Sequence, residues 1–464
     1  MSKLLIRKEL SALMAWKDRP GRKPLLIRGA RQVGKSTLVQ QFAEESGLHL
    51  LCLNFERNPE YREAFASNDP EQIVASLQLL SGERIQPGQT LLFLDEIQSV
   101  PEALVALRYF YEEKPELHLL AAGSLLEFTL AEAQFSMPVG RIETLYLGPM
   151  QFSDFLNAMG QAQVAEYLQT LSIEDIHKGN MLAAVHKKCM GLLRQYWITG
   201  GLPEAVATYA ASKDFFDVAR VQQNIVATYR DDFNKYAGRS VSLVQMVFDH
   251  LPVMVGRKFT YAQVSRDHRA ADIATALQQL CQARIAQKIF HTSANGIPLE
   301  AEINPRYFKT LYLDIGLLSA SLKLNVIDLD KTDISLINNG ALAEQFIGQH
   351  MLYSGESYET PALYYWARES KSAAAEIDYL MTYAQQIVPV EIKAGTTGRL
   401  KSLHQFLKEK RGDFALRFNA DVPSLLNDSK KLTDGSDIEY RLLSLPLYMV
   451  EQADRLVHGC LHWQ

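Results

Sequence analysis

The most constraining feature of this 464-residue chain is a glycine-bounded octapeptide that stands between an apolar run and a helical pattern. The octapeptide consists of Gly29, Ala30, Arg31, Gln32, Val33, Gly34, Lys35 and Ser36. The apolar run at 24–28 predicts a buried strand, and the segment 37–43, which starts at Thr37, has the period of an amphipathic helix. A strand that passes through such a loop into a helix is the repeating unit of a parallel α/β sheet, so an α/β fold is expected.

The residue types of the octapeptide are those that bind phosphate. Glycines at both ends let the backbone curl, so that its N–H groups and the N-terminus of the helix surround phosphate oxygens. Lys35 would place a cation on the β- and γ-phosphates, and the hydroxyl of Ser36 would coordinate Mg²⁺. This pattern is the P-loop, and we expect the residues from Gly29 to Thr37 to bind ATP together with Mg²⁺.

Further apolar runs follow the octapeptide within residues 1–150. They cover residues 49–55, 90–94, 117–122 and 142–147. With helical patterns between them, they predict a five-stranded parallel sheet. The run at 90–94 ends in Asp95 and Glu96. Asp95 is expected to hold the Mg²⁺ water shell, and Glu96 to polarise the water that attacks the phosphate.

A glutamate beside a metal-binding aspartate resembles the AAA-type branch of P-loop ATPases. The resemblance implies two further residues. Ser124, at the end of the fourth strand, is similar to the small polar residue that senses the γ-phosphate or orients water, although a serine here also suits a helix N-cap. Arg141, before the fifth strand, is similar to the arginine finger that acts on a neighbouring subunit's nucleotide, which implies a homo-oligomer.

The middle of the chain is mainly helical in pattern. Residues 151–240 resemble the helical lid of AAA-type enzymes, and the sequence Gly-Gly-Leu-Pro-Glu at 200–204 predicts a sharp turn within it. Residues 241–308 show three helical stretches, a strand and a polar turn, the order of a winged helix-turn-helix. The expected recognition helix holds few cations, which favours a packing module over a DNA reader.

Two strands with a period of two are predicted near the C-terminus. The segment 375–380 alternates and carries Glu376 and Asp378 on one face, and the segment 388–393 alternates again. Glu391 and Lys393 share one face of the second strand because they are two residues apart. An ion pair between Lys393 and Asp378 on a solvated face is one interpretation of this pattern.

The other interpretation comes from a resemblance to the PD-(D/E)XK nuclease superfamily, in which an acidic strand residue precedes Glu-x-Lys. The resemblance implies that Glu344, on a preceding helical stretch, joins Asp378 and Glu391 as a Mg²⁺ ligand. Lys393 would position or deprotonate the water that attacks a phosphodiester. Pro389 withdraws a ladder donor just before this motif, which indicates a bulge or a strand start.

The order of the parts resembles a large prokaryotic ATPase family of unknown biological role. We expect an AAA-type core at 1–150, a helical lid at 151–240, a winged-helix-like linker at 241–308 and a PD-(D/E)XK-like domain at 309–464. The segments that look like recurring segments of that family are 200–204, 312–317 and 390–393.

Composition limits the partners. The formal net charge is −5, so any DNA contact must be local, through the C-terminal domain, rather than through a basic surface as a whole. The four cysteines are too far apart in the sequence for a zinc motif or a disulfide framework, which fits the cytoplasm. No run of about 18 uncharged apolar residues occurs, so no membrane partner is expected.

Three functions are consistent with these patterns. The leading hypothesis is a Mg-ATP-hydrolysing protein that controls a C-terminal metal-dependent DNA nuclease. The alternative is a nucleotide-dependent signalling switch whose C-terminal domain binds a protein partner without cleavage. A mechanical remodeller or DNA translocase would need a ring and a pore loop, and no aromatic pore motif stands out between the second and third predicted strands.

Overall fold

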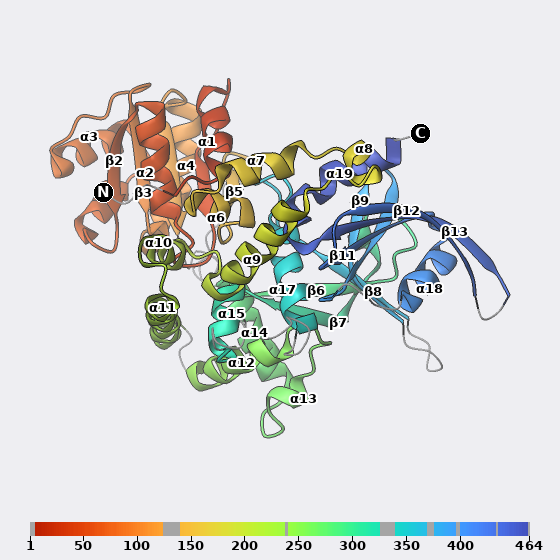
Figure 1. Ribbon diagram of the computed structural model, residues 1–464. Helices are drawn as coiled ribbons and strands as arrows, with labels where there is room; N and C mark the ends of the chain where they lie inside the picture. The colour runs from red at the N-terminus through yellow and green to blue at the C-terminus, as the bar shows by residue number, and fades with distance from the viewer. Residues whose placement is uncertain are drawn as a thin grey trace.

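Two β-sheets form the framework of the protein in the computed structural model, within the residues that it describes. Those residues are 5–123, 140–236, 240–324, 339–368, 375–395, 400–432 and 435–462. Figure 1 shows the first sheet in the red and orange N-terminal part, the second in the green to blue part, and helices between them. No helix of the described ranges combines the length and the apolar character that crossing a membrane requires.

The first sheet is the parallel sheet expected for the N-terminal region. Its strands are β1 (Leu25–Arg28), β2 (His49–Asn54), β3 (Thr90–Asp95), β4 (His118–Gly123) and β5 (Glu143–Tyr146). They are hydrogen-bonded in the order β2-β3-β4-β1-β5, and every pair is parallel. Each strand lies where an apolar run predicted one, because a parallel sheet covered by helices needs apolar side chains on both faces. This confirms the α/β fold.

Helices cover both faces of this sheet. They are α1 (Glu9–Asp18), α2 (Lys35–Ser46), α3 (Pro70–Ser81) and α4 (Pro101–Glu113), with 3-10 turns η1 (Pro59–Phe65) and η2 (Ile97–Ser99). Alternate strand residues enter two different cores. Ile27 packs in the core that includes Phe42 of α2, whereas Leu26 packs in the core that includes Leu107 of α4.

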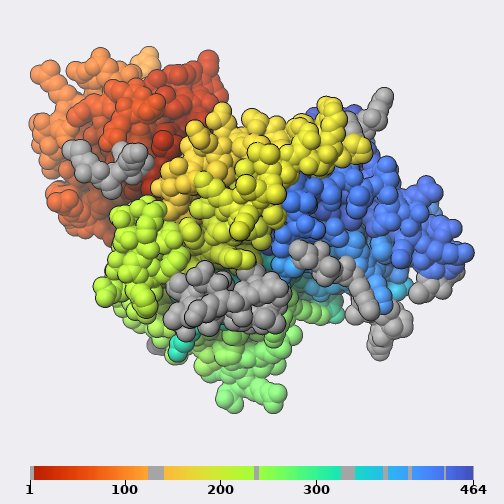
Figure 2. Space-filling view, in the orientation of Figure 1, coloured from red at the N-terminus to blue at the C-terminus, as the bar shows by residue number. Residues whose placement is uncertain are grey.

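A helical region follows the first sheet, as the periodicity predicted. Its helices are α6 (Phe152–Ala158), α7 (Ala162–Thr170), α8 (Ile173–His177), α9 (Ala183–Thr199), α10 (Pro203–Ser212) and α11 (Phe215–Tyr236). Tyr196 makes edge-to-face contacts with Phe155 and with Phe346, a residue of the C-terminal part. The yellow segment in Figure 2 accordingly lies between the red N-terminal and the blue C-terminal surface.

Three helices and a hairpin come next, in the order expected of a winged helix. They are α12 (Val241–Met254), α13 (Tyr261–Val264), α14 (Ala270–Gln282), β6 (Ala286–Thr292), η4 (Leu299–Glu302) and β7 (Ile303–Tyr312). The hairpin is not separate from the C-terminal part, because Phe290 and His291 of β6 pair with Tyr364 and Tyr365 further along the chain. The second sheet therefore crosses the boundary expected at residue 308, and the division of the chain into domains stays a prediction.

The C-terminal part completes the second sheet. Its elements are α15 (Ile315–Ser321), α17 (Asn339–Leu352), β8 (Tyr364–Ala367), β9 (Glu376–Tyr383), β10 (Gln386–Ile392), α18 (Lys401–Lys410), β11 (Phe414–Asn419), β12 (Ser424–Lys431), β13 (Asp437–Pro446), η6 (Leu447–Gln452) and α19 (Ala453–His462). The strand order is β12-β13-β11-β10-β9-β8-β6-β7, with parallel and antiparallel pairs. Helix α17 packs against β7 and β10.

Pro389 lies inside β10, between β9 and β11, and the β9 pairing continues through it without a register shift, so the expected bulge or strand start is wrong. It pairs with Leu380 of β9, whereas the parallel pairing with β11 begins one residue later, at Val390. The N–H of Ile392 points to β9 and that of Lys393 to β11, so the alternation directs the nitrogen of Pro389 toward β11, before that ladder starts. Pro389 therefore removes no hydrogen bond from the β10–β11 ladder, because that ladder begins after it.

Candidate nucleotide site and carboxylate cluster

The octapeptide forms a loop from the end of β1 to the start of α2. Gln32 and Gly34 have left-handed backbone, with φ of 66° and 94°. A Cβ on Gly29 would lie 2.3 Å from the carbonyl oxygen of Leu147, just after β5, and one on Gly34 would lie 3.0 Å from Cγ of Pro203. Close backbone packing at Gly29, and positive φ at Gly34, therefore require glycine at both ends of the loop.

Lys35 is almost fully buried at the base of this loop. Its Nζ donates to the carbonyl oxygens of Gly29 at 3.0 Å and Ala30 at 2.9 Å, which are neutral acceptors. Burial lowers the pKa of Lys35 to about 8. The charges of Glu96 and Asp95 oppose this effect, and those of Arg31 and Arg284 add to it. Arg284 precedes β6, far away in the sequence, and no sequence motif marked it. The loop thus holds a buried cation on neutral acceptors, which an anionic phosphate would complement.

A hydroxyl group and a carboxylate group lie next to each other beside the loop. The hydroxyl of Ser36 donates to the carboxylate of Asp95 at 3.3 Å, and Nδ2 of Asn54 donates to the same carboxylate at 3.1 Å. Burial raises the pKa of Asp95, and the charge of Glu96 raises it further. Hydroxyl and carboxylate oxygens are ligands that Mg²⁺ takes, so these residues fit a Mg-nucleotide. Asn54, which pairs with Asp95 across β2 and β3, was missed by the sequence argument.

Glu96 has an unusual backbone. Its φ is 54°, a left-handed conformation that costs a non-glycine residue roughly 1–3 kcal/mol and that is often found at functional sites. Its N–H donates to Asp95 Oδ1 at 3.2 Å, and its carboxylate accepts from Nε2 of Gln98 at 2.7 Å. The conformation turns the chain sharply after β3, so that the two carboxylates stand at the end of the strand.

Helix α11 holds the loop from the far side. Arg31 forms an ion pair with Asp232, and the hydroxyl of Tyr229 donates to the carbonyl oxygen of Arg31 at 2.7 Å. Both partners lie on α11, in the region expected to form a lid. A side chain of the loop and its backbone are therefore tied to the helical region.

Two residues that the AAA resemblance implied stay predictions. Ser124 lies outside the described residues. Arg141 precedes β5, is about half exposed, and its Nε donates to Glu112 Oε1 of the same chain at 2.8 Å. An arginine finger acts on a neighbouring subunit's nucleotide, and a single chain does not test that role.

A second set of charged residues lies on the C-terminal sheet and on helix α17, which packs against it. Glu344 of α17 and Glu376 and Asp378 of β9 offer carboxylate oxygens that lie within 4.8 Å of one another. We call these three residues the carboxylate cluster. Asp378 also accepts from the N–H of Ile392 at 2.7 Å, and burial together with the charge of Glu344 raises its pKa well above the usual range. The sequence placed Glu376 on the same face as Asp378 but did not assign it to the site.

Glu391 and Lys393 lie beside the cluster. They form an ion pair with each other, so the expected alternative of a pair between Lys393 and Asp378 is wrong. Glu391 is buried, and its Oε2 has no hydrogen-bond partner. Burial raises the pKa of Glu391, and the charge of Glu391 in turn raises the pKa of Asp378. Glu391 therefore lies close enough to the cluster to interact with it, although it is not one of the three mutually adjacent carboxylates.

A lysine that the sequence argument missed lies within the cluster. Nζ of Lys309, on β7, lies 2.7 Å from Glu344 Oε1 and 2.5 Å from Glu376 Oε1, and the side chain is only 3% exposed. Burial alone lowers the pKa of Lys309, but the carboxylates of Glu344, Asp378 and Glu376 raise it well above its ordinary value. The one signal in the sequence is a lysine within the largely apolar run from Tyr307 to Leu318.

The donor set of the cluster fits a hard divalent cation. Carboxylate oxygens are the ligands that Mg²⁺ prefers, and the unpartnered Oε2 of Glu391 is a further buried oxygen beside them. The ammonium group of Lys309 already contacts two of the three carboxylates. Lys309 and a metal ion would thus share the same oxygens.

Comparison with protein families finds a match to a model described as an AAA domain over residues 21–156, which include β1 to β5 and the loop. Models described as domains of unknown function, DUF8612 and DUF4143, match residues 190–328 and 339–438. The carboxylate cluster lies in the last of these ranges. No curated protein matches the chain.

Solved structures show weak overall similarity. The Thermotoga maritima RuvB Holliday junction branch migration motor is 17% identical, with a TM-score of 0.29 over 69% of this chain and 94% of that one. The Aeropyrum pernix ORC1 protein in complex with DNA is 11% identical, with a TM-score of 0.28 over the same shares. C. elegans PCH-2 is 12% identical, with a TM-score of 0.28 over 46% of this chain, which spans 65% of PCH-2. At these TM-scores the likenesses add nothing to the functional argument.

The parallel sheet and the loop geometry define a P-loop nucleotide-binding domain. The family match gives its branch: residues 21–156 form an AAA-type ATPase domain. The matches to the rest of the chain carry no functional description.

Proposed function

We propose that this chain hydrolyses Mg-ATP at the P-loop and uses the state of the bound nucleotide to control the C-terminal domain that holds the carboxylate cluster. Lys35 would move from its carbonyl acceptors to the β- and γ-phosphates. Ser36 and Asp95 would hold Mg²⁺, which when bound neutralises phosphate charge, and Glu96 would accept a hydrogen bond from the attacking water.

The observation that carries the proposal is the double-glycine turn formed by Gly200 and Gly201 just before α10. The turn and the first residue of α10 contact the P-loop on one side and Asp314 on the other. On one side, Pro203 packs against Gly34 of the loop, where an added Cβ would lie 3.0 Å from its ring. On the other side, the N–H of Gly201 donates to Asp314 Oδ2 at 2.7 Å, and a Cβ on Gly200 would lie 2.0 Å from Asp314 Oδ1. The turn therefore contacts both the loop and Asp314, and we expect a displacement of the loop to reach Asp314 through it.

Asp314 is in turn connected to the carboxylate cluster. It caps α15 just after β7, the strand that carries Lys309. Gln345 of α17 accepts from the N–H of Tyr312 at 2.9 Å and donates to its carbonyl oxygen at 2.7 Å. Gln345 directly follows Glu344, so buried hydrogen bonds link the end of β7 to the helix that supplies a cluster carboxylate.

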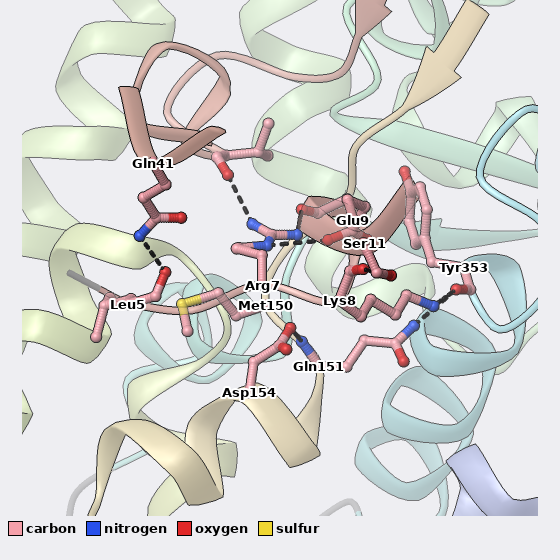
Figure 3. Close-up of polar contacts among 12 residues, drawn as sticks. Leu5, Arg7, Lys8, Glu9, Ser11, Gln41, Met150, Gln151, Asp154 and Tyr353 are labelled. Atoms are coloured by element: carbon pink, nitrogen blue, oxygen red, sulfur yellow. Dashed lines mark hydrogen bonds and ion pairs between the residues drawn. The ribbon is translucent and has the colours of Figure 1, made fainter. Parts of the chain in front are cut away.

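The N-terminal segment makes a second connection, shown in Figure 3. The guanidinium of buried Arg7 donates to the carbonyl oxygen of Val33 in the loop at 2.9 Å and to that of Gly148 at 2.8 Å. The ammonium group of the next residue, Lys8, donates to the carbonyl oxygen of Tyr353, just after α17. Neighbouring residues thus hold the loop and the end of α17 together.

Hydrogen exchange tests this control. A non-hydrolysable ATP analogue is expected to change the exchange of β7 and α17 amides in the wild type, and Asp314→Asn should reduce that change while nucleotide affinity stays within about threefold. Asp69→Asn is the matched control, because Asp69 caps α3 in the same way, away from the route. An analogue that leaves β7 and α17 unchanged in the wild type contradicts the proposal.

The more specific proposal for the C-terminal domain is metal-dependent cleavage of DNA, with Glu344, Asp378 and Glu391 as ligands and Lys393 beside the water. Nuclease assays with Mg²⁺ or Mn²⁺ and ATP should then show cleavage by the wild type and none by Asp378→Ala. Lys35→Ala should lose the ATP dependence. If single-stranded, duplex and branched DNA all stay intact with the wild type, this proposal is wrong.

The alternative, a switch that binds a protein partner without cleavage, is favoured by one observation: Lys309 already neutralises part of the cluster. In that case Lys393→Ala should keep full function in cells, and an ATP-dependent pull-down should recover the same partner with the variant and with the wild type. Loss of function in Lys393→Ala with ATPase activity intact would instead support cleavage.

A further inference from the structure

We infer that Lys309 is the resident cation of the carboxylate cluster, and that a divalent metal ion binds there only by displacing its ammonium group. The inference rests on the proposed metal role of the cluster and adds to it a built-in competitor. Its basis is the placement of Nζ at 2.7 Å from Glu344 and at 2.5 Å from Glu376.

The backbone of Lys309 is fixed on both sides, so only the side chain is free to leave. On one side β7 pairs Lys309 with Ile289 of β6. On the other, Lys309 forms a β-bridge with Lys258, and the N–H of the next residue, Phe259, donates to the carbonyl oxygen of Phe308 at 2.9 Å. The Nζ atom lies 5.3 Å from the centre of the Tyr365 ring. Displacement of the ammonium group therefore requires a rotamer change of the four-carbon side chain.

The same oxygens cannot serve both cations well. Mg²⁺ and Mn²⁺ need carboxylate oxygens at about 2.0–2.2 Å, and the ammonium group takes one oxygen of Glu344 and one of Glu376. A divalent ion placed a few ångströms from Nζ would be repelled in a partly buried environment. The second oxygen of Glu344 is confined as well, because a Cβ on Gly256 would lie 2.5 Å from it.

The cluster is nevertheless not saturated by Lys309. Three carboxylates face one ammonium group, which leaves a formal charge of −2 when all three are ionised. Glu391 Oε2 is buried beside them without a hydrogen-bond partner. Two arrangements therefore follow: Lys309 inserted, or a divalent ion inserted with Lys309 turned away.

Mn²⁺ binding tests this inference without any activity measurement. Free Mn²⁺ is followed by electron paramagnetic resonance during titration of nucleotide-free full-length protein, with Asp95→Ala in every sample so that the P-loop does not contribute. Lys309→Met, which is neutral and of similar size, is expected to bind Mn²⁺ at least about tenfold more tightly than the parent, whereas Lys309→Arg should remain weak. Lys288→Met, on the neighbouring strand, is the matched control for loss of one nearby charge and should match the parent.

The outcomes separate the inference from the proposed function. Equal, measurable affinity in the parent and in Lys309→Met overturns the competition but leaves the cluster as a metal site. No binding in either protein overturns the metal role and the inference together. Should the methionine variant fail to fold, Lys309→Gln replaces it with the same expectation, because its amide can still donate hydrogen bonds to the carboxylates without carrying a charge.

Discussion

Two buried lysines of this chain have opposite environments. Lys35 donates to two neutral carbonyl oxygens, and its pKa is lowered to about 8, chiefly because burial removes it from water. Lys309 is at least as buried, yet the carboxylates of Glu344, Asp378 and Glu376 outweigh burial and raise its pKa well above the ordinary value. Burial alone therefore does not decide whether the pKa of a lysine is lowered or raised; the charge of its acceptors does.

The difference shows which site is prepared for an external anion. Lys35 carries a charge that the loop does not neutralise, so phosphate gains its interaction in full. Lys309 already has anions from its own chain, so any ligand of the cluster must be a cation that replaces it. Lys35 thus waits for an anionic ligand in the P-loop, whereas Lys309 already occupies the carboxylate cluster before any ligand binds.

The largest expected effect concerns Lys35. Lys35→Ala should lower ATP hydrolysis by about a thousandfold, because the transition-state phosphates lose their buried cation. Phosphate release at saturating ATP measures this, with Lys288→Met, at a half-buried lysine on β6, as the control that keeps the wild-type rate. Comparable rates of ATP hydrolysis in Lys35→Ala and Lys288→Met would contradict the role of Lys35 as the cation of the phosphate site.

Replacement by methionine should affect stability with opposite signs. Lys309→Met leaves the buried carboxylate of Glu344, together with those of Glu376 and Asp378, without its cation and should lower the local free energy of unfolding by about 3–5 kcal/mol. Lys35→Met removes a buried charge whose direct acceptors are neutral carbonyl oxygens, so the stability of the first sheet should stay the same or rise. Native-state hydrogen exchange at β7 and at β1 reports the two effects separately. A stability loss of equal size at both places would show that both lysines act as structural ion pairs.

The smallest expected effect is the pH dependence of ATP binding. In the free protein Lys35 loses its proton as the pH rises through about 8, whereas bound phosphates favour the charged form and raise its pKa. ATP binding at pH 9 should therefore take up a proton, and affinity should fall by up to about tenfold per pH unit above 8. Calorimetry in two buffers of different ionisation enthalpy measures the uptake. Lys35→Arg, which stays protonated, should abolish it, and an unchanged uptake in that variant contradicts the assignment to Lys35.

The parts of the site that the sequence predicted are local or follow strand alternation. The residues from Gly29 to Ser36 are contiguous, so the motif by itself predicts the loop. Asp95 was found because a strand end is visible as the end of an apolar run. The period of two predicted the strand that carries Asp378, whereas its place in the site was implied by the resemblance to the PD-(D/E)XK nucleases. These signals depend on neighbouring positions alone, which is why no tertiary information was needed.

The residues that were missed reach their sites from other elements. Asn54 comes from the strand beside β3, Arg284 from the turn after α14, and Lys309 from β7, the strand that crosses the boundary expected at residue 308. Asp314 and Gly201 each stand in a segment that the sequence marked as recurring, but nothing in either segment showed that they hydrogen-bond to each other. Such contacts are set by how the two sheets and the helices pack.

By itself the sequence determined the parallel sheet, the phosphate loop and the presence of acidic residues near the C-terminus, because each follows from hydrophobic period or from a short motif. Only the tertiary structure decided that Lys309 joins Glu344 and Glu376, and that a double-glycine turn joins the loop to Asp314. The physical reason is that the ionisation of a buried lysine depends on which charges the fold brings within a few ångströms of it. The separation of two residues along the sequence does not reveal their distance in space.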